Sequence, residues 1–185
     1  MTLLESDPAD THSSLAIDWP AQVEFLALYF KPKQPSDGPA VSDVEIIKLL
    51  SETEIPADKT ILDTIRPKLD PAQNINSRSH ALLQFAEQLF QQYITQNHID
   101  MNLVGSLNGL RSAMAATLFN EPTPWNTSNF LPSFCDMIAK NICGWHSGLG
   151  RAGDRFFQQF DSQMLLLGNT PQSIEMGSGE LIDFF

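Results

Sequence analysis

The chain has 185 residues, of which 42% are hydrophobic and 18% are charged. This length suits a single domain, and the composition excludes wholesale disorder because enough apolar side chains are present to build a core. The formal net charge of −11 comes from the two ends of the chain. Residues 1–63 hold twelve acids against four bases, and residues 169–185 hold three acids and no base, whereas residues 64–168 balance. Since no basic stripe is present, we predict no binding to nucleic acid.

Targeting signals are also missing from the chain. No apolar run reaches the roughly 18 residues that a membrane span requires. The first residues, MTLLESDPADTHSS, are acidic and lack the basic-then-apolar layout of a signal peptide. We therefore expect a cytoplasmic protein without membrane insertion. Two cysteines, Cys135 and Cys143, are expected on one helix about 12 Å apart, too far for a disulfide.

Apolar residues recur at helical spacing through most of the chain, which predicts an all-α fold. We expect one orthogonal or antiparallel bundle of six or seven helices with flexible acidic ends. The expected helices cover about 20–30, 43–51, 57–66, 77–97, 100–119, 129–143 and 154–167. Ser42 and Glu45 match a capping box at the start of the second helix. For this helix we expect Val44, Ile47 and either Leu50 or Leu49 to point inward.

The predicted organisation has three parts. Residues 1–17 form a flexible N-terminus, residues 18–168 form the helical domain, and residues 169–185 form an acidic tail. Within the domain, we expect the core at 77–167 and the first 70 residues as shorter helices on its outside.

Residues 100–119 are expected to form the central helix. Five large apolar residues recur there at spacings of three and four: Leu103, Leu107, Leu110, Met114 and Leu118. Gly105, Gly109 and Ala113 form a second line at spacing four. Each glycine inside a helix costs about 1 kcal/mol relative to alanine. We therefore predict that another helix packs very closely against this line.

A glycine-rich segment follows the sixth expected helix and contains the pattern G-x-G-x-x-G at Gly148, Gly150 and Gly153. In dinucleotide-binding folds this pattern follows a strand, but here a helical pattern precedes it, so we do not predict a dinucleotide site. Two interpretations stay open. The segment is either a tight connection between helices or a site for an anion or small ligand. The candidate ligand-binding residues are Trp145, His146, Arg151, Asp154 and Arg155.

No catalytic residue, metal or cofactor is predicted from the remaining reactive side chains. Cys135, Cys143 and His146 lack the two close-spaced ligand pairs of most zinc sites. The four histidines are scattered and match no nucleophile motif. Whether the protein is an enzyme stays undecided at this point, with a non-enzymatic role favoured.

The chain ends in GELIDFF, where Ile182, Phe184 and Phe185 are candidate partner-binding residues. An apolar end after acidic residues can insert into a partner pocket, fold back on its own domain, or fray. The segment loosely resembles the acidic, aromatic-ended tip with which bacterial single-stranded DNA-binding proteins recruit partners. That resemblance implies a docking peptide and nothing more.

A second resemblance covers residues 103–160. Their order of an amphipathic helix, a proline-containing break, a helix ending in Gly-Trp and a third helix resembles an uncharacterised family of large bacterial helical proteins. The residues that carry it are Leu107, Leu110, Phe130, Ile138, Gly144, Trp145 and Phe160. The resemblance implies a bacterial helical module and no chemistry. A His-Pro-Ala-Arg-like motif that belongs to the second helix is absent, because the chain reads SNFLPSF there.

Two functions remain open from the sequence. The first is a non-enzymatic protein-interaction or regulatory module that binds another protein, favoured by the balanced core, the acidic ends and the docking-like end of the chain. The second is an anion- or small-ligand-binding protein or enzyme that uses residues 144–155. The oligomeric state is left open.

Overall fold

The computed structural model describes residues 19–30, 38–120 and 130–185. Within these residues it contains α-helices, two short 3₁₀ helices and no strand, which confirms the all-α prediction. The nine α-helices of the described residues are α1 (Trp19–Tyr29), α2 (Asp43–Glu52), α3 (Ile61–Ile65), α4 (Ser77–Gln96), α5 (Met101–Val104), α6 (Asn108–Asn120), α7 (Phe130–Ile142), α8 (Gly150–Leu167) and α9 (Pro171–Phe184). The 3₁₀ helices are Arg66–Lys68 and Ser147–Leu149. The expected segment 1–17 lies outside the described residues.

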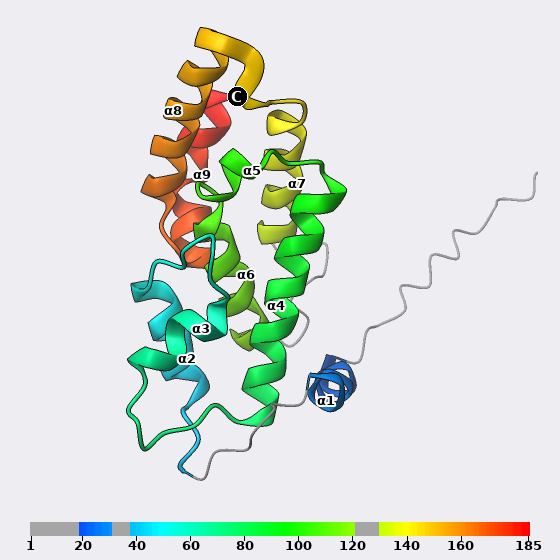
Figure 1. The fold of residues 1–185 in the computed structure, drawn as a ribbon, viewed down its shortest axis with the longest axis vertical. Helices are drawn as coiled ribbons and strands as arrows, with labels where there is room; N and C mark the ends of the chain where they lie inside the picture. The colour runs from blue at the N-terminus through cyan, green and yellow to red at the C-terminus, as the bar shows by residue number, and fades with distance from the viewer. Residues whose placement is uncertain (1–18, 31–37, 121–129) are drawn as a thin grey trace, which may run out of the picture.

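The helices enclose two hydrophobic cores that share α4 and α6 (Figure 1). We define the C-terminal core as the buried cluster that includes Phe90, Leu103, Leu107, Leu110, Phe134, Ile138, Phe160 and Ile174. We define the N-terminal core as the buried cluster that includes Ile46, Leu50, Ile55, Ile61, Ile65, Leu82, Ala86 and Ala115. The expected core at 77–167 was therefore too narrow, because α2 and α3 build a core rather than lie outside one.

Side-chain caps begin several helices where the sequence indicates them. The amide of Glu45 donates to Ser42 Oγ at 3.2 Å, which starts α2, and the amide of Ser79 donates to Asn76 Oδ1 at 2.8 Å, which starts α4. The inward face predicted for α2 was wrong for Val44, which is 77% exposed, and is confirmed for Leu50, which is buried. Ile47 is partly buried against the N-terminal core, and Ile46 is fully buried there, because α2 turns the side that carries Ile46 and Leu50 toward α6.

The predicted central helix is broken into α5 and α6. The amide of Leu107 donates to the carbonyl of Val104, and Asn108 donates to Gly105, so a tight turn of i to i−3 bonds separates the two helices. All five apolar residues of the predicted face are buried nevertheless: Leu103, Leu107, Leu110, Met114 and Leu118. The turn places the apolar residues of both helices in the cores.

Close approach of another segment occurs at one of the two glycines. A Cβ at Gly109 would lie 2.6 Å from the carbonyl oxygen of Gly168, in the turn between α8 and α9. A Cβ at Gly105 would meet nothing within 4 Å. A close approach is thus confirmed for Gly109, although the segment that approaches is a turn and not the predicted helix. The prediction was wrong for Gly105, which lies in the turn between α5 and α6.

The flexible acidic tail predicted at 169–185 is instead the helix α9. Thr170 and Ser173 form a capping box at its start, with the amide of Ser173 donating to Thr170 Oγ1 at 3.0 Å, and Pro171 occupies the first turn. Ile174 and Leu181 are fully buried in the C-terminal core. Burial of these side chains stabilises a helix whose own sequence is a poor helix former.

Candidate functional site

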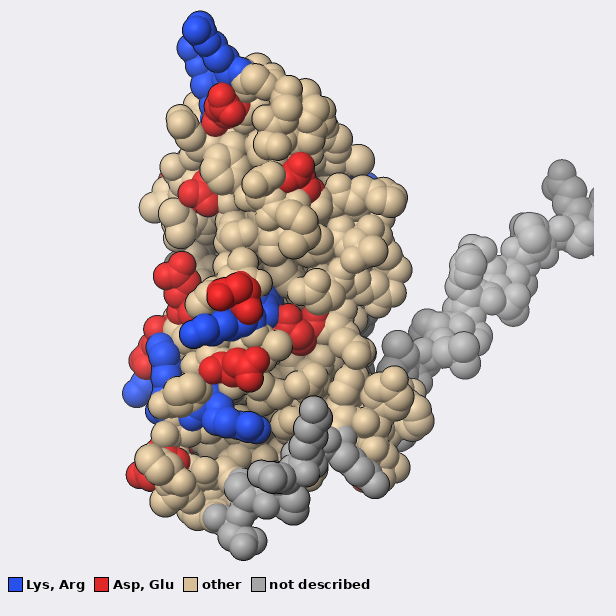
Figure 2. All heavy atoms as spheres, in the orientation of Figure 1, with Lys and Arg blue, Asp and Glu red and all other residues tan. Residues whose placement is uncertain are grey.

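The outer face of α1 carries an apolar stripe that no described residue covers. Leu28 and Tyr29 follow Phe25 by three and four residues, which places all three side chains on one side of the helix. Their exposed fractions are 62%, 67% and 70%. Figure 2 shows mainly uncharged surface over α1, at the lower right of the molecule, while charged side chains are visible over α2 and α3 and on the upper half of the molecule. We call Phe25, Leu28 and Tyr29 the α1 stripe.

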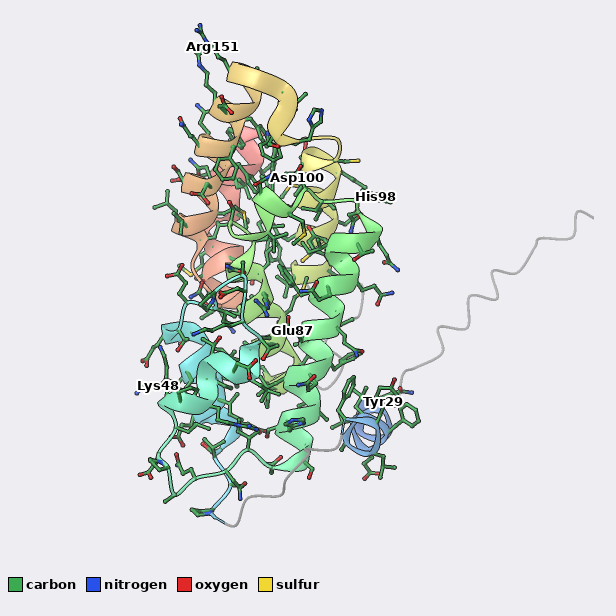
Figure 3. The ribbon with its side chains drawn as sticks, in the orientation of Figure 1. Tyr29, Lys48, Glu87, His98, Asp100 and Arg151 are labelled. Carbon is green, nitrogen blue, oxygen red and sulfur yellow. The ribbon has the colours of Figure 1, made fainter. Side chains whose placement is uncertain are left out.

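The opposite face of α1 is held on α4. Val23 is buried in the N-terminal core, and the carbonyl of Phe30 accepts a hydrogen bond from His80 Nδ1 at 3.0 Å. A carbonyl can only accept, so Nδ1 carries the proton. Burial lowers the pKa of His80 below its ordinary 6.5, the bond to Phe30 opposes that shift, and the positive charge of Arg66 adds to it. These contacts place α1 with its stripe at the edge of the molecule, where Figure 3 shows Tyr29.

A helix that is apolar on all sides is normally buried on all sides. In α1, Glu24 is the one charged residue, yet the described residues cover only the inner face. Single exposed apolar side chains are common and need no explanation, but three adjacent ones on one stripe indicate a contact surface. The helical periodicity of the sequence predicted this helix at about 20–30 but did not identify its exposed apolar side, although the all-round apolar composition was a usable signal.

The glycine-rich segment forms a packed connection between α7 and α8. Trp145 stacks on Phe157 with ring centroids 5.7 Å apart, and its indole N–H donates to the carbonyl of Gly153 at 3.1 Å. His146 Nδ1 accepts the amide hydrogen of Gly148 at 3.1 Å. Trp145 and His146 therefore use their polar atoms to shape the connection. Gly144 follows α7 with φ +83°, a left-handed conformation that suits the end of a helix.

The charged candidates of this segment do not converge. Arg151, Asp154 and Arg155 are exposed residues in the first turns of α8, which begins at Gly150 and not at Asp154 as predicted. Arg151 projects away from the molecule at the top of Figure 3. No ion pair within the described residues involves either arginine. The glycine pattern follows helix α7, not a strand, so it lacks the setting of a dinucleotide site.

The aromatic residues at the end of the chain lie against their own domain. Phe184 contacts Phe156, with ring centroids 5.6 Å apart, and Phe185 contacts Phe160 at 6.2 Å. Ile182 is about half exposed on the opposite side of α9. Of the three predicted partner-binding residues, the two phenylalanines thus make contacts within the chain.

A cleft of about 330 Å³ lies between α4 and α7. Tyr93 crosses it and donates a hydrogen bond from its hydroxyl to the carbonyl of Cys135 at 2.9 Å. Burial raises the pKa of the Cys135 thiol to about 12, so the thiol stays protonated and is a poor nucleophile at neutral pH. Cys143 is exposed and stands apart from the cleft lining.

The described residues form neither a metal-binding cluster nor a membrane-spanning helix. In the described parts of the chain, no three His, Cys, Asp or Glu side chains gather closely enough to hold a metal ion. None of the helices in 19–30, 38–120 and 130–185 is long and apolar enough to cross a bilayer. Comparison of the chain with protein-family models, with curated proteins and with solved structures finds no match.

Proposed function

We propose that this chain is a non-enzymatic helical protein-interaction or regulatory module that binds another protein through the α1 stripe. The supporting observation is the exposure of Phe25, Leu28 and Tyr29 on a helix whose other face is docked on α4. Large aromatic side chains carry much of the binding energy in protein interfaces, and each can bury about 150–250 Å². The stripe therefore offers a contact of high energy for its size.

The shape of the stripe favours a groove as its binding site on the partner. A standard flat interface covers about 800 Å² on each partner, which exceeds what three side chains on one ridge can supply. A groove surrounds such a ridge and buries more of each side chain. Recognition of a helix in a groove uses anchors at spacings of three and four, the spacing of the α1 stripe.

Charge favours a different protein over a second copy of this chain. Glu24 is the one charged residue between Trp19 and Phe30, and the whole chain carries −11. Two such chains repel each other at long range, whereas a partner with Lys or Arg at the groove rim is attracted. The partner is thus expected to present an apolar groove with a basic rim.

Co-purification from the source cells with quantitative mass spectrometry tests this function. The Phe25→Ser, Tyr29→Ser double variant is expected to lose a defined set of proteins that the wild type retains. Val44→Ser combined with Met101→Ser is the matched control, because both residues are exposed apolar side chains outside the stripe. Equal recovery from the wild type and the α1 variant, with equal melting temperatures, would refute the proposal.

A further inference from the structure

The helix α9 is weak by sequence and depends on its packing. Gly177, Gly179 and two serines lie inside it, and each is a poorer helix former than alanine. Glu180 and Asp183 lie near its C-terminal end, where the helix dipole disfavours negative charge, and the helix holds no base. Apart from its N-terminal capping box, little within α9 favours the helical state, so contacts with the rest of the domain must stabilise it.

One of the two glycines has a packing role and the other has none. A Cβ at Gly177 would lie 2.9 Å from Leu167 Cδ2, so the small residue allows α9 to cross α8 closely. A Cβ at Gly179 would meet nothing within 4 Å. Gly179 therefore lowers the stability of α9 without improving its packing.

Helices α6, α7 and α8 form the trough in which α9 lies. Ile174 and Leu181 are fully buried there, and Phe184 and Phe185 rest on Phe156. These contacts would be the same if α9 came from another copy of the chain. The trough is therefore complementary to one known occupant, the α9 sequence itself.

The connection between α8 and α9 is short and conformationally restricted. Gly168 has φ +73° and ψ −162°, a backbone conformation that is essentially confined to glycine. Only Asn169 and Thr170 separate it from Pro171. The Gly168 carbonyl also packs on Gly109 of α6. Short hinge connections of this kind favour exchange of the element that follows them, because few residues are available to turn the chain back onto its own domain.

We infer that α9 exchanges between copies of this chain, so that the trough of one copy binds the α9 of a second copy. The swapped dimer keeps the trough contacts of the monomer and changes only the hinge. Because each copy carries −11, added salt should favour the exchange by screening the repulsion. This inference is independent of the α1 stripe, so either can fail without the other.

A labelled synthetic peptide of residues 169–185, added to the full-length protein, tests the inference by fluorescence anisotropy. We expect saturable binding, and we expect the same peptide carrying Leu181→Asp to bind at least tenfold more weakly. No saturable binding, or equal binding of the two peptides, would overturn the inference.

Two variants of the full-length protein change the competition from its own α9 in opposite directions. Gly179→Ala strengthens the resident α9 and is expected to weaken peptide binding about fivefold, since an alanine in a helix is favoured by about 1 kcal/mol. Gly168→Ala strains the closed hinge and is expected to tighten peptide binding and to raise the dimer fraction in light scattering. Circular dichroism confirms that each variant is folded. Unchanged peptide affinity in a folded Gly179→Ala protein would contradict exchange of α9, whether or not Gly168→Ala folds.

Discussion

The two hydrophobic cores are built in different ways. The buried residues of the C-terminal core come mostly from long helices and include the aromatic rings of Phe90, Phe134 and Phe160. Those of the N-terminal core are aliphatic, and beside the shared helices α4 and α6 many of them come from short helices and the segments that connect them. Long helices can form wherever one apolar face is covered, whereas short helices and loops need specific polar contacts to hold them in place.

A buried ion pair provides such contacts for the N-terminal core. Arg111 on α6 donates from Nη2 to Glu87 Oε2 on α4 at 2.6 Å, and its side chain is 3% exposed. Arg111 also donates to the carbonyls of Pro56 and Lys59, and Glu87 accepts the amide hydrogen of Ile61. Figure 3 shows Glu87 where α4 faces α3 and α6. The pair thus attaches the α2–α3 connection to the two helices that run through both cores.

The largest effect is expected from Leu107→Asp, because Leu107 is fully buried in the C-terminal core. The change removes about 2 kcal/mol of apolar burial and adds the cost of an unpaired buried carboxylate. We expect both cores to unfold together, since α4 and α6 contribute to both. Far-UV circular dichroism should show loss of the helical signal, and a variant that retains half of it in a cooperative transition would show that the cores fold separately.

A smaller effect is expected from Arg111→Met, which leaves Glu87 buried without its partner. Breaking a buried pair in this way costs about 3–5 kcal/mol, measured by urea unfolding. Arg78→Met is the matched control, because the Arg78–Asp43 pair is exposed and is expected to contribute less than about 1 kcal/mol. Equal losses in the two variants would mean that the buried pair does not stabilise the N-terminal core.

Replacing the two glycines of the α5–α6 region by alanine should have different effects on the stability of the domain. Gly109→Ala places a Cβ 2.6 Å from the Gly168 carbonyl and is expected to destabilise the domain by about 1–3 kcal/mol. Gly105→Ala meets no neighbour and is expected to be neutral or to stabilise by up to about 1 kcal/mol. Thermal melts of both variants compare the two sites directly, and a stabilised Gly109→Ala protein would contradict the close contact with the hinge.

As the pH falls, His80 on the N-terminal side should lower the free energy of unfolding before Asp100 on the C-terminal side does. Because burial lowers its pKa, His80 binds a proton more weakly in the folded state than in the unfolded state. The contribution of neutral His80 to the stability of the fold is therefore complete above pH 6.5 and is lost as the pH falls through the lowered native pKa. His80→Gln should reduce the difference between urea unfolding at pH 7 and at pH 5, and an unchanged difference would exclude this histidine as the cause.

Asp100, on the C-terminal side of the molecule, should lose its contribution to the stability of the fold only in stronger acid. The amide of Asn102, the carboxamide of Asn102 and the amide of Ser147 donate to Asp100 and lower its pKa below the usual 3.8. Stability from Asp100 is therefore present above pH 3.8 and is lost below it. Asp100→Asn should change urea unfolding at pH 7 but leave the difference between pH 7 and pH 5 intact.

The helical periodicity of the sequence was enough to predict the part of the C-terminal core that precedes α9. Leu103, Leu107 and Leu110 were expected inward and are buried, although the turn at Gly105 was not foreseen. That turn depends on the hydrogen bonds from the amides of Leu107 and Asn108 to the carbonyls of Val104 and Gly105, which periodicity does not indicate. Val44 of α2 was misassigned for a similar reason, because the neighbours of a helix decide which of its apolar residues are covered.

Contacts between distant segments account for most of what the sequence did not reveal. The Glu87–Arg111 pair joins residues 24 positions apart, and no local pattern marks it. Helix α9 was mistaken for a tail because its glycines and acids argue against a helix, while the trough that stabilises it is formed by α6, α7 and α8. The Thr170–Ser173 capping box was a local signal that could have indicated its start.

Site-specific photo-crosslinking in the source cells tests the proposed role of the α1 stripe most directly. A photoreactive residue at position 28 lies on the exposed side of α1. One at position 26 is partly buried and follows the buried Val23 by three residues, so it lies on the same side of the helix as Val23. We expect position 28 to crosslink to a distinct second protein and position 26 to crosslink within the chain. Crosslinks from position 28 only to the same chain or to a second copy of it would contradict the account.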